Sequence, residues 1–155
     1  MNVRPILQAL VLADHVYIDA KTGKKIIAGT FNHLAAPEFP SFFGRTTYAF
    51  ISMTEVHGNT PVTLKYTDLS TSETLLEIRD LPMEAPNDPL ATVEMVVELP
   101  RFPMPHEGIF AFEVFAHNEQ VGTLRIQVSQ SAEESSNEGE DDDEEEDEDE
   151  DSDDE

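Results

Sequence analysis

The sequence predicts an all-β fold: a single antiparallel β-sandwich of about eight strands, immunoglobulin-like or C2-like in type. Short segments of alternating apolar and polar residues recur throughout residues 1–130, and turn-forming residues separate them at short intervals. No long segment has the apolar period of a helix. Eight strands of this kind are enough for two antiparallel sheets packed face to face.

The expected strands follow one another with turn residues between them. Ile6 to Ile18 and Lys24 to Phe31 form the first pair, joined through Gly23, which permits a tight reversal. The clearest pair is the last, in which Ile109 to Ala116 and Val121 to Val128 flank a short turn. The remaining strands are expected at 45–55, 62–68, 74–83 and 91–99.

Two connections between these strands, 37–44 and 100–105, are rich in Phe and Pro. One interpretation is that the Phe side chains of 37–44 plug an end of the sandwich, because Phe is usually buried, and that 100–105 is a rigid extended crossover. The other is that they form an exposed apolar surface that docks a protein partner. The candidate binding residues are therefore Phe39, Phe42, Phe43, Phe102, Pro103 and Pro105.

The charge divides the chain into two parts. The 155 residues carry 33 acids against 9 bases, a net charge of -24, and residues 131–155 contain 18 of those acids and no base. This leaves residues 1–130 with 15 acids and 9 bases, a net charge of -6. Since an acidic run repels itself and has nothing to bury, we expect a folded domain at 1–130 followed by a disordered acidic tail at 131–155.

Composition also limits the chemistry and the location. The chain has no Cys, which excludes disulfides and thiolate sites and fits a reducing compartment, so we expect a cytoplasmic protein. The apolar stretch from Ile6 to Ala13 is too short to span a bilayer, and we expect no membrane partner. Clustered bases that would bind phosphate backbones are missing, so no nucleic-acid partner is expected either. Nothing in the sequence implies a cofactor.

Asp14, His15, Tyr17 and Asp19 form the best cluster of titratable side chains. A His beside carboxylates can act as a base or bind a metal ion. In a strand, His15, Tyr17 and Asp19 would share one face while Asp14 points to the other, so a metal would need further ligands from elsewhere in the fold. Hydrogen bonding at the end of a strand is the simpler interpretation.

Five segments of the sequence are distinctive: Gln8 to Tyr17, Thr22 to Phe31, Phe43 to Arg45, Asp88 to Leu90 and the hairpin from Gly108 to Val128. In these segments the chain resembles a family of short bacterial proteins of unknown function. It covers residues 5–128 and leaves the acidic tail outside. It implies a small β-sandwich and brings no activity or ligand with it.

These observations favour a non-enzymatic protein-interaction module whose partner is a protein, and a basic one if the acidic tail takes part. Two alternatives stay open. A compact β domain with a polyacidic tail is an architecture that histone chaperones share, which suggests a chaperone-like binder of basic proteins. The cluster around His15, Tyr17 and Asp19 suggests a small hydrolase or a metal-dependent enzyme. Open sheet edges also allow a homodimer through edge strands.

Overall fold

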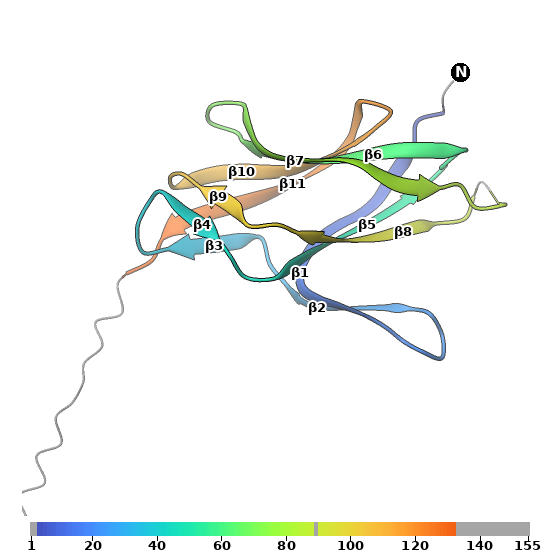
Figure 1. Ribbon diagram of the computed structural model, residues 1–155, viewed down its shortest axis with the longest axis horizontal. Coiled ribbons are helices and arrows are strands. Elements are labelled where there is room, and N and C mark those ends of the chain that lie inside the picture. The colour runs from blue at the N-terminus through green and yellow to red at the C-terminus, as the bar shows by residue number, and fades with distance from the viewer. Residues whose placement is uncertain (1–2, 89, 133–155) are drawn as a thin grey trace, which may run out of the picture.

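The computed structural model describes residues 3–88 and 90–132 and confirms the all-β class (Figure 1). This part of the chain contains no helix long and apolar enough to cross a membrane. The predicted acidic tail lies outside the described residues, apart from its first two positions. The strands are β1 (Ile6–Ile18), β2 (Lys25–Thr30), β3 (His33–Ala36), β4 (Ser41–Phe43), β5 (Thr47–Thr54), β6 (Asn59–Asp68), β7 (Glu73–Glu84), β8 (Val93–Leu99), β9 (Phe102–Met104), β10 (Gly108–Ala116) and β11 (Glu119–Gln130).

The strands form two main sheets and a small third one. The first sheet has the order β2-β1-β5-β8, the second has the order β3-β11-β10-β6-β7, and β4 pairs with β9. The expected number of about eight strands is therefore wrong, because β3, β4 and β9 raise the total to eleven in the described residues. The expectation of a purely antiparallel sandwich also fails at one place, where β3 pairs with β11 in parallel.

The core lies between the two main sheets and follows from the alternation of their strands. In β5 the side chains of Ala49, Ile51 and Met53 point inward and are fully buried. They face a layer of large side chains from the second sheet, which includes Leu64, Tyr66, Phe110, Phe112, Val114 and Ile126. This packing supplies most of the apolar burial that stabilises the domain.

The hairpin of β1 and β2 folds back along the first sheet. Glu94 on β8 lies opposite Ser52 on β5, and Ser52 lies opposite Ala9 on β1. Lys25 on β2 lies opposite Ile18, which is much further along β1. In a straight strand, Ala9 and Ile18 would be about 30 Å apart, yet Lys25 Nζ lies 2.6 Å from Glu94 Oε2. The strand β1 must therefore turn sharply, as Figure 1 shows for the blue hairpin below the sandwich. We call residues 14–30 the arm.

Candidate functional site

One side of the sandwich carries two strand edges that, within residues 3–88 and 90–132, have no partner strand along part of their length. The strand β1 pairs with β5 from Ile6 onward, but β2 joins its other edge only from Ala13. In the second sheet, β3 joins the edge of β11 only from Gln127 onward. We call the gap between these two edges, β1 at 6–12 and β11 at 120–126, the seam.

The seam is closed at both ends. At one end Leu7 lies against Gly122, where an added Cβ would come within 2.1 Å of Leu7 Cδ2, and Arg4 donates a hydrogen bond to the carbonyl of Gln120. At the other end the chain crosses from one sheet to the other at 30–32. There the Phe31 N–H donates to the Leu12 carbonyl at 3.2 Å, and the Gln127 N–H donates to the Asn32 carbonyl at 2.9 Å.

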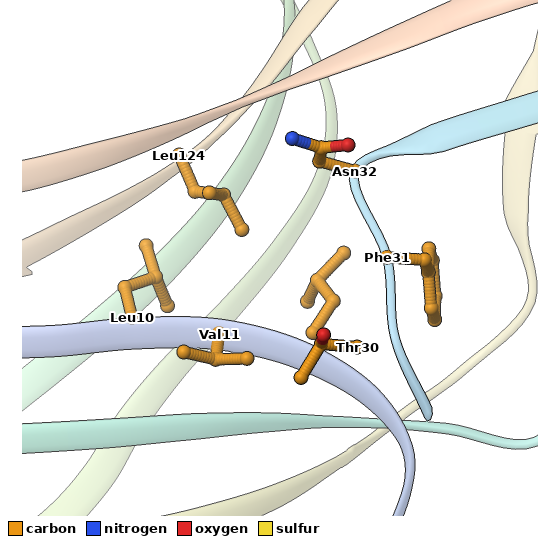
Figure 2. Close-up of a pocket in the computed structure, with 7 residues that line it drawn as sticks. Leu10, Val11, Thr30, Phe31, Asn32 and Leu124 are labelled. Atoms are coloured by element: carbon orange, nitrogen blue, oxygen red, sulfur yellow. The ribbon is translucent and has the colours of Figure 1, made fainter. Parts of the chain in front are cut away.

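Between these ends lies a notch of about 240 Å³ (Figure 2). Its lining residues are uncharged and mostly apolar: Leu10, Val11, Leu12, Thr30, Phe31, Asn32 and Leu124. Figure 2 shows Leu10 and Leu124 on opposite walls, with Phe31 and Asn32 at the crossing. Leu12 is fully buried, whereas Leu10 and Leu124 are half-buried. A side chain of a bound partner in the notch would therefore remove the exposed parts of Leu10 and Leu124 from water.

The notch also presents backbone groups that pair with no strand in the part of the chain that the structure describes. Since Leu12 offers its carbonyl to Phe31, strand alternation directs the N–H and C=O of Leu10 to the same open side. Since Gln127 donates to Asn32, the same alternation directs the backbone of Arg125 and Thr123 into the seam. The seam therefore combines apolar side chains with the hydrogen-bonding groups that a further strand would need.

The two Phe- and Pro-rich connections come together as the β4–β9 pair, which the sequence could not place. Phe42 lies opposite Pro103, and Phe43 lies opposite Phe102. Phe102 is fully buried, while Phe39 and Phe43 are half-buried and packed against the core. Three of the four aromatic side chains in these connections therefore pack with the core.

Phe42 is the exception among these aromatic residues. It is 58% exposed, and the Arg101 guanidinium lies over its ring at 5.5 Å. Pro103 and Pro105 are half-buried. Of the candidate binding surface, the structure thus leaves one large exposed aromatic side chain, stacked with a cation.

The titratable cluster near the end of β1 does not converge on one point. Asp14 pairs with Arg45 at 3.3 Å, and the His15 and Tyr17 rings stack at 5.6 Å. Asp19 lies in the hairpin turn, where hydrogen bonds from the backbone N–H groups of Lys21 and Thr22 lower its pKa. Within residues 3–88 and 90–132, no three His, Asp or Glu side chains are placed to hold a metal ion.

A different polar cluster, centred on Asp68, joins the end of β6 to the connection between β9 and β10. His106 Nε2 lies 2.5 Å from Asp68 Oδ2, and the Ser70 hydroxyl donates to Asp68 Oδ1 at 2.7 Å. His106 Nδ1 lies 2.5 Å from the Glu107 carbonyl, so both ring nitrogens face acceptors. Sequence reasoning missed this cluster, because nothing local relates residues 38 positions apart.

The hydrogen bonds of this cluster shift both pKa values. The Glu107 carbonyl, followed by the Asp68 carboxylate, raises the pKa of His106. Burial alone would raise the pKa of Asp68, but the hydrogen bonds from Ser70 and His106 outweigh it, and the pKa is lowered. The pair therefore favours a charged His106 beside an ionised Asp68.

The fold and its seam define a small β-sandwich with an open side and an arm. The chain belongs to a family of unknown function, DUF6941, which matches residues 8–129 and confirms the family resemblance. A solved immunoglobulin-like protein from Pseudomonas aeruginosa is similar to it, with 14% identity, a TM-score of 0.40, and coverage of 82% of this chain and 98% of that one. No curated protein matches the sequence significantly.

Proposed function

We propose that this protein is a non-enzymatic interaction module that takes up a short extended segment of a partner protein in the seam. The observation that carries the proposal is the notch, where uncharged and mostly apolar walls lie beside backbone groups of two strand edges that no other described strand covers. Extended peptides bind to such edges by adding a strand, with backbone hydrogen bonds for affinity and side-chain pockets for specificity. The cysteine-free composition supports a cytoplasmic setting.

The edge of β11 already accepts a strand further along. There β3 occupies the place beside Gln127 to Gln130, and the incoming segment would continue that row beside Thr123 and Arg125. Each backbone hydrogen bond contributes about 0.5–1.5 kcal/mol. Burying one Val or Leu side chain in the notch contributes about 1.5–3 kcal/mol. Because association has its own entropic cost, the expected binding is weak and reversible.

The Asp68 cluster supports the non-enzymatic part of the proposal. A serine nucleophile needs a base within hydrogen-bonding reach, but Ser70 donates to Asp68 instead of His106. His106 has no ring nitrogen free for a substrate, since both face protein acceptors. The cluster is therefore better suited to holding two connections together than to proton transfer.

Titration of the isotope-labelled full chain with a capped peptide of alternating valine and threonine tests the proposal by NMR. We expect the largest amide shifts at Leu10 and from Thr123 to Arg125. Leu124→Glu, which places a charge on the notch wall, should weaken binding about tenfold or more, equivalent to about 1.4 kcal/mol.

The matched control is Val96→Glu, because Val96 is 36% exposed on β8, away from the seam. This variant should bind as the unaltered chain does. The milder Leu124→Ser should also weaken binding, in case Leu124→Glu lowers stability. Shifts scattered over the surface, or equal binding by all variants, would contradict a seam site.

A second candidate function is the binding of basic proteins through the acidic segment, favoured by the 18 acids in residues 131–155. Such binding is electrostatic and weakens steeply with salt. The test is titration with polylysine of the full chain and of a full-length variant whose acids at 140–151 are replaced by the corresponding amides. Salt-sensitive binding that the amide variant loses supports this function, and equal binding by both chains removes it.

A further inference from the structure

We infer that the segment bound in the seam carries an acidic side chain next to its apolar anchor, and that Arg125 recognises this carboxylate on the outer face of the second sheet. This inference rests on the proposed function and specifies the chemistry of the partner. Three observations carry it: the position of a second hollow, the charge around it, and the alternation of β11.

The second hollow adjoins the notch. It measures about 450 Å³ and is lined by Asn32, His33, Ile109, Arg125 and Gln127. Asn32 lines both spaces, and Figure 2 shows its side chain at the crossing beside the notch. A segment that fills the notch therefore comes within reach of this hollow.

The charge of the hollow is positive and unmatched. Arg125 is its only Lys or Arg, and it makes no ion pair with any carboxylate of the described residues. Glu113 lies on the same face, opposite Thr123, and forms no ion pair with it either. His33 is held by a 2.7 Å contact between its Nε2 and Ser129 Oγ. The hollow thus offers a guanidinium beside the amides of Asn32 and Gln127, a donor set that fits a carboxylate.

Strand alternation links the two spaces. Leu124 and Arg125 are neighbours on β11, and their side chains point to opposite faces of the sheet. A strand added beside them alternates in the same way, so a residue pointing into the notch is followed by one on the Arg125 side. The preferred pattern is therefore an apolar residue with Asp or Glu directly before or after it. The net charge of -6 on residues 1–130 makes this basic position distinctive.

The test uses three capped peptides of equal length, in which valine alternates with threonine, aspartate or lysine. The full chain and its Arg125→Gln variant are titrated with each peptide, followed by NMR. The quantity measured is the ratio of the affinities for the aspartate and threonine peptides, which cancels effects common to both. We expect Arg125→Gln to lower this ratio about fivefold, as for a partly exposed ion pair.

Lys21→Gln is the matched control. It removes one positive charge in the exposed turn of the arm, so the net charge changes equally while the hollow stays intact. This control should leave the ratio unchanged, and Arg125→Glu should favour the lysine peptide over the aspartate peptide. The acidic segment at 131–155 is the same in every chain and does not affect the comparison.

The outcomes separate the two claims. If no peptide shifts the resonances of Leu10 and Thr123 to Arg125, the seam site itself is wrong. If all three peptides bind there and Arg125→Gln leaves the ratio unchanged, the seam stands and acid recognition by Arg125 is wrong. A ratio lowered equally by Lys21→Gln would assign the preference to net charge and also overturn the inference.

Discussion

The two long sides of the sandwich differ in the charge that their strand edges carry. On one side, β8 presents Glu94 and Glu98 along its open edge, and β7 carries Glu73, Glu77, Arg79, Asp80 and Glu84 together with register shifts in its pairing. On the other side, the residues lining the notch in the seam are uncharged. Charged side chains protect an edge from pairing with another chain. Register shifts do not separate the two sides, because β1 shifts beside Leu7 and the β10–β11 pairing shifts beside Gly122. The two sides therefore differ in charge: the β7–β8 side is guarded by acidic side chains, and the notch in the seam has no charged residue in its lining.

The largest expected difference between the sides is in what a side-chain truncation does to stability. Met83 on β7 is 1% exposed, whereas Leu124 in the seam is half-buried. Met83→Ala should lower the free energy of unfolding by about 2–5 kcal/mol, because it leaves a cavity. Leu124→Ala should lower it by only about 1 kcal/mol, because water already reaches this residue. Urea denaturation of both full-length variants measures the two values, and equal losses would mean that the seam is as closed as the guarded side.

The long interior strands of the two main sheets could be predicted from the sequence better than the seam. Alternation at 45–55 and 109–116 predicted β5 and β10 because the period of a strand is a local property. The strands β3, β4 and β9 have only three or four residues, too few for alternation to stand out. Once β4 is known, its alternation explains why Phe43 packs inward while Phe42 is exposed.

The seam itself has no local signal. It exists because β1 turns away after Ala13 and because the chain changes sheets at 30–32, and both events depend on contacts between distant residues. In the sequence, Leu10, Leu12 and Leu124 cannot be distinguished from ordinary core residues. The contact between Asp68 and His106 is hidden for the same reason.

The arm determines where the seam ends, and Gly29 is its most sensitive position. Gly29 has a φ of 72°, and an added Cβ would come within 2.5 Å of Asp14 Oδ2. Gly29→Ala should therefore cost about 1–3 kcal/mol in unfolding free energy, from backbone strain and the clash together. Gly23→Ala is the control, because Gly23 has a similar φ of 70° but open space around it. If both variants lose the same stability in thermal denaturation, the contact with Asp14 contributes nothing to the arm.

The free energy of unfolding of the domain should depend on pH through His106 and Asp68. The pKa of His106 is raised in the folded state. Its contribution to stability is therefore complete below the ordinary histidine pKa of about 6.5, and it is lost as the pH rises through the pKa of the folded state. The lowered pKa of Asp68 gives stability that is complete above about 3.9 and is lost on further acidification. Both contributions are present between these limits.

Replacing His106 tests this dependence. The difference in unfolding free energy between the unaltered chain and His106→Gln should be largest near pH 5 and should shrink by pH 8. Urea denaturation at the two pH values measures it, with Leu124→Ala as a control whose effect should not change with pH. A constant difference for His106→Gln would show that the contact with Asp68 does not depend on the imidazolium charge.

The smallest effect on stability is expected from Glu94→Thr combined with Glu98→Thr on β8. This double variant also tests directly whether the acidic side chains keep the β8 edge from pairing. The loss of the Lys25–Glu94 ion pair should cost no more than about 1 kcal/mol, since both side chains are partly exposed. Two Thr residues leave a flat, uncharged edge that can pair with the same edge of a second copy. Light scattering should then show a mass that rises with protein concentration. The control is Glu144→Thr with Glu145→Thr, which removes the same charge from the acidic segment and should leave the mass independent of concentration. If the unaltered chain already forms a dimer and the β8 variant does not enlarge it, homodimerisation uses another edge, and the seam becomes the first place to look for it.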